Sequence, residues 1–365
     1  MNKNPLVLYN VKMIKAVNKY NTLIDETPEL DNNKCKDYVS PTIHPSCLEE
    51  YIGQKRAKLI LNDAIVSAQK RSVPLNHIMI TSCGPGVGKT TLSKLIADRM
   101  GVKCVTAVGS MIENYNDIFN LFSQVRNTDN PIIIIDEIHR LKPALCETMY
   151  LAMEDFNSVF KKNVDFGACG DISFRVGPFT LIGLSAGEQG FLPRPFLDRF
   201  DIKITLQKYT MEDMIKIVKQ SSEKMAIKLS DNIIKSVAER SVFTPRIANN
   251  LLKRILDYKT SRDIKSIADK DIKKIFDMLG IDNIGLDEVA RKVLTALANS
   301  SRGTCGVNSL ASIVNVEQST LKNIIEPQLL MHELIVYQSR GRAITSAGLK
   351  HLGREDIINK TKEAR

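Results

Sequence analysis

Lys89 and Thr90 follow a glycine cluster, and residue types in this arrangement bind phosphate. Three closely spaced glycines precede them: Gly84, Gly86 and Gly88. Glycines let backbone N–H groups turn toward phosphate oxygens, a lysine adds positive charge there, and a neighbouring hydroxyl suits Mg²⁺. The segment predicts a phosphate-binding loop, although Cys83 occupies the first glycine position of the pattern G-x-x-x-x-G-K-[ST]. The alternative for this segment alone is an ordinary glycine-rich turn between a strand and a helix.

A second pair of reactive residues, Asp136 and Glu137, follows the β-branched run at 132–135. Such a run is typical of a strand buried on both faces, and α/β sheets bind ligands at the carboxyl ends of their strands. We expect Asp136 to hold Mg²⁺ and Glu137 to polarise the attacking water, because phosphoryl transfer mainly needs positioning and charge neutralisation. Two acids that cap the next helix are the alternative, which the nearby phosphate loop disfavours.

The elements that must position these residues alternate along the chain. From Leu48 onward, helical and strand patterns predict a parallel sheet with helices on both faces. The expected strands cover 77–81, 103–107, 132–135 and 179–183, and the expected helices lie around 59–65 and at 91–100. Residues 171–176 alternate polar and apolar side chains, which is typical of a half-exposed hairpin strand.

The second half of the chain predicts two smaller domains. Residues 211–279 show only helical spacing, which indicates a helical lid. Helices at 286–298, 308–314 and 319–329 precede a hairpin at 334–345, which is the winged-helix plan. The predicted division is 1–42 as a variable extension, 43–208 as the large ATPase domain, 209–282 as the lid, 283–353 as the winged helix and 354–365 as a tail.

Bulk properties limit the classes of protein. The 365 residues suffice for two or three domains, and the formal charge of +10 favours a polyanionic partner such as nucleic acid, though weakly. The seven cysteines are scattered and form no C-x-x-C pair, which argues for reduced thiols and against a zinc site. No apolar run approaches the ~18 residues of a membrane span, and the N-terminus lacks a signal-peptide pattern. We expect a cytoplasmic protein without a membrane partner.

Seven stretches of the chain resemble the RuvB family, the AAA+ motors of bacterial Holliday-junction branch migration. They occur in the family's order and at nearly its spacing, within 45–353. These stretches are 48–54, 136–141, 152–156, 178–183, 198–200, 244–249 and 285–287. The resemblance implies a hexameric, ATP-hydrolysing ring that moves duplex DNA at four-way junctions during recombination and repair.

The resemblance also implies roles for individual residues. Thr90 and Asp136 would hold Mg²⁺, Glu137 would activate water, Ser185 would sense the γ-phosphate, and Arg199 would be an arginine finger that reaches a neighbouring subunit's ATP. The implied ATP contacts are Ile43, His44, Gly86, Gly88, Lys89, Thr90, Thr91, Glu154, Asp155, Phe156, Arg199, Tyr209 and Arg246. A helix-surface arginine is the alternative for Arg246.

The implied partners are DNA, a RuvA-like junction-binding protein and a RuvC-like resolvase. Arg340 and Arg342 would contact the DNA backbone from the wing tip, with a solvated turn as the alternative. Ile172 and Phe174 would dock on the RuvA-like partner, with packing inside the chain's own core as the alternative.

Several positions depart from the family pattern. They are Cys83, His44, Leu197, Phe243, Tyr337 and the run 184–187, which replaces Thr-Thr-Arg. The hydrolytic residues are retained, so we expect an ATP-driven DNA motor, in a divergent member of the family. The alternative is an AAA+ switch or loader that binds ATP and DNA with reduced hydrolysis. A winged-helix transcription regulator is disfavoured, because it does not need a finger, a sensor and paired acids.

Overall fold

The structure is a computed structural model of the chain. It describes residues 43–82, 84–156, 159–162, 172–187, 192–300, 304–339 and 341–354. The predictions for 1–42, Cys83, Arg340 and most of the tail fall outside these residues. Those for the side chains of Asp155, Ile172 and Phe174 do so as well.

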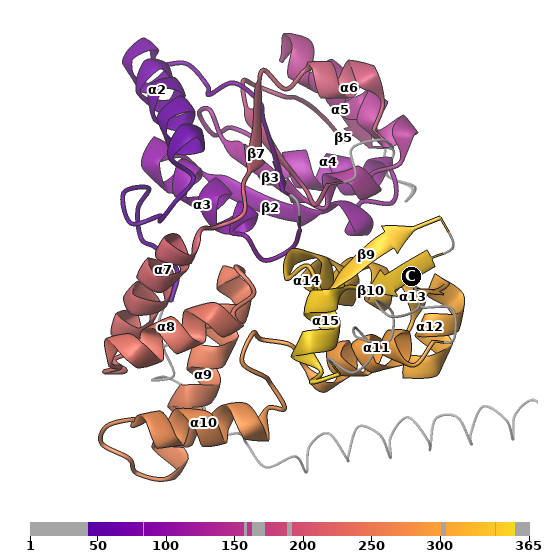
Figure 1. Ribbon diagram of the computed structural model, residues 1–365. Coiled ribbons are helices and arrows are strands. Elements are labelled where there is room, and N and C mark those ends of the chain that lie inside the picture. Colours follow the sequence, from indigo (N-terminus) through magenta and orange to yellow (C-terminus); the bar gives the residue numbers. More distant parts are fainter. Residues whose placement is uncertain are drawn as a thin grey trace, which may run out of the picture. The chain divides into compact units, whose positions relative to one another are not determined.

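A five-stranded parallel sheet forms the first domain, as predicted (Figure 1). Its strand order is β2-β3-β6-β1-β7. The strands are β1 (Ile78–Ser82), β2 (Cys104–Val108), β3 (Ile132–Asp136), β6 (Thr180–Ser185) and β7 (Ile202–Leu206). The three central strands are almost entirely buried, which explains their continuous apolar sequences.

Helices cover both faces of this sheet. They are α2 (Lys55–Arg71), α3 (Lys89–Met100), α4 (Tyr115–Ser123), α5 (Pro143–Asp155) and α6 (Arg194–Asp198), with the short turns η1 (Gly109–Met111) and η2 (Ile138–Arg140). Successive residues of β3 belong to different cores, because side chains of a strand alternate between its faces. Ile134 packs with α2 and α3 in one core, and Ile135 packs with α4, α5 and α6 in the other.

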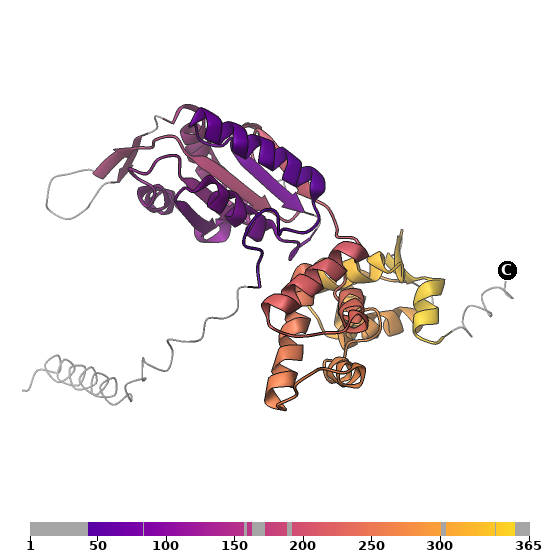
Figure 2. The same cartoon turned by 90° about the vertical axis from the view of Figure 1, so that its left-hand side faces the viewer.

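The predicted hairpin consists of β4 (Val159–Lys162) and β5 (Ile172–Arg175), paired antiparallel. It extends away from the sheet domain (Figure 2). Val176, directly after β5, is buried in the core that contains α4 and α5. The base of the hairpin is therefore anchored in the domain.

Four helices form the lid, as the helical spacing predicted. They are α7 (Met211–Lys224), α8 (Asp231–Arg240), α9 (Pro245–Ser261) and α10 (Asp269–Met278). Thr210 and Ser230 cap α7 and α8 by accepting backbone N–H groups of the first turn. The apolar faces of these helices continue one core of the sheet domain, so the lid shares packing with the nucleotide-binding half.

The C-terminal elements form a winged helix with its own core. They are α11 (Glu288–Ala298), β8 (Thr304–Cys305), α12 (Val307–Val314), α13 (Gln318–Thr320), η3 (Leu321–Ile325), α14 (Glu326–Met331), β9 (Ile335–Gln338), β10 (Gly341–Ile344) and α15 (Ser346–His351). The strands form a small sheet in the order β8-β10-β9. The expected helix at 319–329 is interrupted by the π-helical turn η3, because Pro327 has no N–H to donate to the preceding turn.

No helix in the described part of the chain combines the length and the apolar composition that a membrane crossing requires.

Candidate nucleotide site

The phosphate-binding loop connects β1 to α3. Gly86 and Gly88 have φ angles of 78° and 98°, a region that favours glycine. A Cβ on Gly88 would lie 2.6 Å from the Tyr51 hydroxyl, so packing also requires glycine there. Lys89 Nζ donates to Ser82 Oγ at 2.7 Å and to the Gly84 carbonyl at 3.3 Å. This places the ammonium group at the carboxyl end of β1, where phosphate is expected.

Thr90 and Asp136 meet at the foot of this loop. The Thr90 hydroxyl donates to Asp136 Oδ2 at 2.9 Å, although the two residues lie on different elements. The parallel register of β3 with β6 brings Asp136 to the edge where β1 also ends. Hydroxyl and carboxylate oxygens are ligands that suit Mg²⁺.

Glu137 follows Asp136 in a left-handed conformation with φ 51°. Its backbone N–H donates to Asp136 Oδ1 at 2.9 Å. Its carboxylate lies 3.3 Å from Arg140 Nε and remains substantially exposed. Backbone and side chain together therefore fix the second acid beside the first, at the border of the cavity described next.

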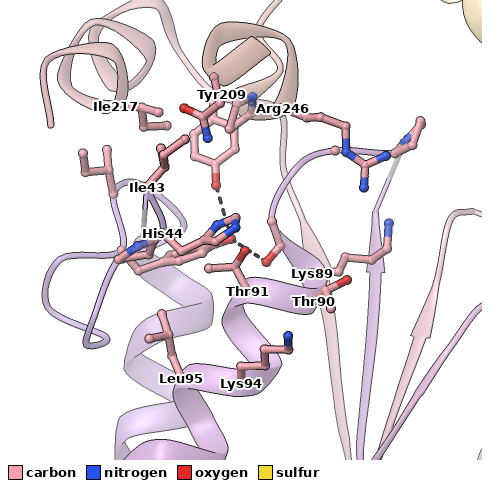
Figure 3. A pocket seen from close by; sticks show the side chains of 18 of the residues that line it. Ile43, His44, Lys89, Thr90, Thr91, Lys94, Leu95, Tyr209, Ile217 and Arg246 are labelled. Carbon is pink, nitrogen blue, oxygen red and sulfur yellow. Dashed lines mark hydrogen bonds between the residues drawn. The ribbon is translucent and has the colours of Figure 1, made fainter. Parts of the chain in front are cut away.

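A cavity of about 880 Å³ connects the loop to the lid (Figure 3). Figure 3 shows Ile43, His44 and Ile217 on one side of it and Lys89 and Thr90 on the other. One end thus carries charge, and the opposite end is largely apolar. This polarity suits a nucleotide, whose phosphates need cations and whose base needs apolar contact. The predicted site residues in its lining are Ile43, His44, Gly86, Gly88, Lys89, Thr90, Thr91, Asp136, Glu137, Tyr209 and Arg246.

Four other predicted residues whose side chains are described lie outside this lining. They are Glu154, Phe156, Ser185 and Arg199. Ser185 is buried, and its Oγ lies 3.1 Å from His139 Nδ1. Ala186, the next residue, contributes to the lining instead. A small apolar side chain therefore borders the cavity at the end of β6.

Arg199 and Glu154 form an ion pair, with Nη2 and Oε2 2.7 Å apart. Arg199 follows α6, and Glu154 lies near the end of α5. Phe156 packs edge-on against Phe179, with ring centroids 5.7 Å apart. The Arg199–Glu154 pair therefore lies outside the nucleotide cavity, and Phe156 packs against the core of the sheet domain.

Tyr51 is a site residue that the sequence did not single out. The Tyr209 hydroxyl lies 3.1 Å from the Val87 carbonyl and 3.2 Å from the Tyr51 hydroxyl, and Tyr51 Oη lies 3.3 Å from the same carbonyl. Burial raises the pKa of both phenols, so both keep their protons, and each can donate one hydrogen bond at a time. Together they hold the Val87 carbonyl of the phosphate loop. Tyr51 lies within a stretch that resembles the family, but periodicity alone gave it no role.

In the wing, the Arg342 side chain forms a largely buried ion pair with Glu326. Its guanidinium donates from Nε and Nη2 to the Glu326 carboxylate at 2.7 and 3.1 Å, and its side chain is only 16% exposed. The Tyr337 hydroxyl donates to the same carboxylate at 2.8 Å. The hydrogen bonds that Arg342 donates to Glu326 raise the pKa of Arg342. A buried carboxylate on α14 therefore holds Arg342 against the domain, and a contact of this side chain with DNA stays a prediction.

Three family models match the chain in succession. Residues 43–206 match the model described as Holliday junction DNA helicase RuvB P-loop domain. Residues 209–282 match the RuvB AAA lid domain, and residues 283–353 match the RuvB C-terminal winged helix domain. The three matches together follow the described chain almost from end to end.

Similar proteins cover nearly the same length. The chain is 37% identical over 328 residues to the Holliday junction branch migration complex subunit RuvB of Pseudothermotoga lettingae, covering 89% of this chain and 93% of that protein. The subunit of the same name from Kosmotoga olearia is 35% identical over 322 residues, covering 87% and 92%. The solved structure of the Thermotoga maritima RuvB Holliday junction branch migration motor is 33% identical, with a TM-score of 0.72, covering 85% of this chain and 98% of that one.

Proposed function

The chain belongs to the RuvB family, and from this premise we propose that it is the ATP-driven motor subunit of a Holliday junction branch migration complex. The observation that carries the proposal is the contact of Thr90 with Asp136 at the phosphate loop, in a chain that also has a winged helix. The contact supports ATP hydrolysis, and the winged helix supports work on DNA. We also propose that the large ATPase domain ends at residue 208, that the lid covers 209–282 and that the winged helix begins at residue 283.

The residues of one subunit would share the chemistry as follows. The backbone N–H groups of the loop and Lys89 bind the β- and γ-phosphates, and Thr90 with Asp136 holds Mg²⁺, which neutralises charge on the phosphate oxygens when bound. Glu137 orients the attacking water and accepts its proton. Arg246 approaches the phosphates from the lid. Tyr209 and Tyr51 keep the loop in its binding conformation.

A neighbouring subunit would complete the site. Arg199 lies outside its own subunit's cavity lining, which supports a finger that acts on the next subunit's γ-phosphate. Glu154 is paired with it, and Asp155 and Phe156 follow Glu154 in sequence, so these predicted ATP contacts fit the same surface. This arrangement requires a ring, and we propose the homohexamer that the resemblance implies.

DNA and protein partners extend the proposal. The net charge of +10 supports contact with a polyanion, and we retain Arg340 as a contact to duplex backbone. The hairpin β4–β5, with Ile172 and Phe174, would dock on a RuvA-like junction-binding protein, and a RuvC-like resolvase would act on the same junction. We place this activity in the cytoplasm, in recombination, repair and the response to DNA damage.

One observation favours a second candidate, an ATP-binding switch or loader with reduced hydrolysis. Ala186 borders the cavity at the end of β6, whereas the hydroxyl of Ser185 is directed to His139. A site without a hydroxyl at that border would stabilise the transferring phosphoryl group less well.

ATP turnover separates the two candidates. It should be measured for the chain alone, with linear duplex, with a four-way junction, and with the junction plus a RuvA-like protein. A motor should turn over ATP faster with the junction and partner and should convert junctions into duplex products, whereas Lys89→Ala should do neither. A chain that binds ATP and DNA but shows the same slow turnover in every mixture would be the switch.

A further inference from the structure

The segment from Ile43 to Glu50 covers the apolar end of the cavity. Ile43, His44 and Pro45 line it, together with Leu95 and Ile217. The segment has no regular secondary structure, so a helix or sheet does not hold its backbone in place. Other contacts must fix it if it is to pack against the base of a nucleotide.

One ion pair takes part in three of these contacts. Lys224 Nζ, at the end of α7, donates to Glu50 Oε2 at 2.7 Å and to the His44 carbonyl at 2.8 Å. The Ser46 N–H donates to the same Glu50 oxygen at 2.9 Å. A lid lysine and a single carboxylate oxygen thereby fix the backbone at 44 and 46. We call Lys224 and Glu50 the base latch.

The lid helix that carries this lysine also lines the cavity. Ile217 and Gln220 belong to α7 and border the cavity, and Gln220 Nε2 donates to the Glu50 carbonyl at 3.1 Å. One face of α7 therefore both touches the base end of the cavity and holds the segment that covers it. The conformation of the covering segment therefore depends on where α7 of the lid lies.

The electrostatics agree with a role in orientation. The hydrogen bond from Lys224 is the largest cause of a lowered pKa for Glu50, so this carboxylate is ionised at neutral pH. The side chains of Lys224 and Glu50 are 21% and 39% exposed, and ion pairs with this much solvent contact add little to folding stability. The pair's effect is thus expected in the geometry of the covering segment more than in the stability of the fold.

We propose that Lys224 is a positioning residue for nucleotide binding, which orders residues 43–46 over the base through Glu50 and the His44 carbonyl. This inference rests on the proposed function, because it treats the cavity as an ATP site. It assigns the base end of the site to the lid, and the phosphate end to the loop. Loss of the latch therefore weakens only ligands that carry a base.

Two ligands test this division: ATP and inorganic tripolyphosphate, each titrated into the full chain by calorimetry. In Lys224→Met, the Kd for ATP should rise about tenfold, as expected for the loss of a charged hydrogen bond that orders the segment. The Kd for tripolyphosphate should stay the same, because this ligand has no base. Lys224→Arg should restore ATP binding, and Glu50→Ala should weaken it in the same selective way.

Lys292→Met is the matched control, because Lys292 also pairs with a glutamate, Glu288 at 2.8 Å, but lies on α11. It should change neither Kd. Equal weakening of ATP and tripolyphosphate in Lys224→Met, or unchanged ATP binding, would overturn the latch while leaving the nucleotide site in place. A wild-type chain that binds neither ligand would overturn the nucleotide site and the latch with it. The thermal midpoint of each variant verifies that it is folded.

Discussion

Glu137 adopts a left-handed backbone conformation directly after β3, and its carboxylate faces Arg140. If it activates water, Glu137→Gln removes the proton acceptor but keeps the shape and the backbone contact to Asp136. We expect ATP binding to persist and turnover to fall about 100-fold or more, which is the usual size of a general-base contribution. Equilibrium nucleotide binding and steady-state hydrolysis, measured on the same preparation, provide the two readouts.

Glu212→Gln is a suitable control for this change, because Glu212 is an exposed glutamate in the first turn of α7. It should hydrolyse ATP like the wild type. Undiminished turnover in Glu137→Gln would exclude this residue as the base and direct attention to another acceptor.

His77 couples the stability of the sheet to pH. Its Nδ1 accepts the Leu181 N–H at 2.9 Å, and its Nε2 lies 3.3 Å from the Met153 carbonyl, so the folded ring is neutral with its proton on Nε2. Burial lowers the pKa of His77. The unfolded ring protonates near pH 6.5, so its contribution to stability is present above that pH and is lost as the pH falls through the lowered folded pKa.

We therefore expect the thermal midpoint of the wild type to drop between pH 7.5 and pH 5, and to drop less in His77→Gln, which cannot titrate. Burial also lowers the pKa of His332, so the variant should retain some sensitivity to acid. Parallel pH curves for the two proteins would contradict the assignment.

Residues whose neighbours in the sequence suffice to place them could be predicted, whereas contacts between residues far apart in the sequence could not. The glycines within a few positions of Lys89 and Thr90 were enough to place both residues at a phosphate loop, and both line the cavity. The bond from Tyr209 to Val87 spans 122 residues, and no local pattern signals it. The ion pair of Arg342 could not be foreseen for the same reason, since its partner Glu326 lies on another element and is buried only in the folded chain.

At the scale of elements, the wing is attached to α14 through a buried charge. Arg342→Ala would leave the Glu326 carboxylate buried without its cation, at a cost of about 3–5 kcal/mol. We expect a lower thermal midpoint for the C-terminal domain, and circular dichroism of the full chain should measure it. The double variant Arg342→Met with Glu326→Gln should recover much of the loss, because both charges are removed together. A single variant as stable as the wild type would contradict the structural role.

The parallel sheet, the helical lid and the winged helix were predictable because apolar runs mark the buried strands, helical spacing marks the helices, and the order of the two differs between the domains. The π-helical turn η3 was not, since Pro327 lies inside an otherwise continuous helical pattern. The ends of elements also shifted by one or two residues: α3 begins at Lys89, where the pattern of apolar residues had not yet started. Caps and loops set these ends, and periodicity does not report them.

At the scale of the whole molecule, the finger residue predicts shared active sites. Arg199→Ala subunits should bind ATP but lose most hydrolysis, by a factor of roughly 10³ or more. Lys89→Ala subunits should lose ATP binding instead. A mixture of the two should regain activity wherever an intact loop meets an intact finger across a subunit boundary, as measured by ATP turnover against mixing ratio.

Activity that equals the sum of the two separate variants at every ratio would exclude a finger in trans. Dilution adds an independent measure, since turnover per subunit should fall as the assembly dissociates. The Glu154 contact predicts a further detail: Glu154→Gln should leave the Arg199 guanidinium less well oriented and should reduce turnover in mixtures as well as alone.

Gly86 of the phosphate loop contacts Arg246 in the first turn of α9. The Arg246 N–H donates to the Gly86 carbonyl at 3.4 Å, and a Cβ on Gly86 would lie 2.9 Å from Arg246 Cβ. Since α9 has 17 residues, it is about 25 Å long, and its first turn is the part that touches the loop. A tilt of about 10° about that turn would carry its far end roughly 4 Å. On the proposed function, release of one phosphate from the loop would thus become a larger displacement at the far side of the lid.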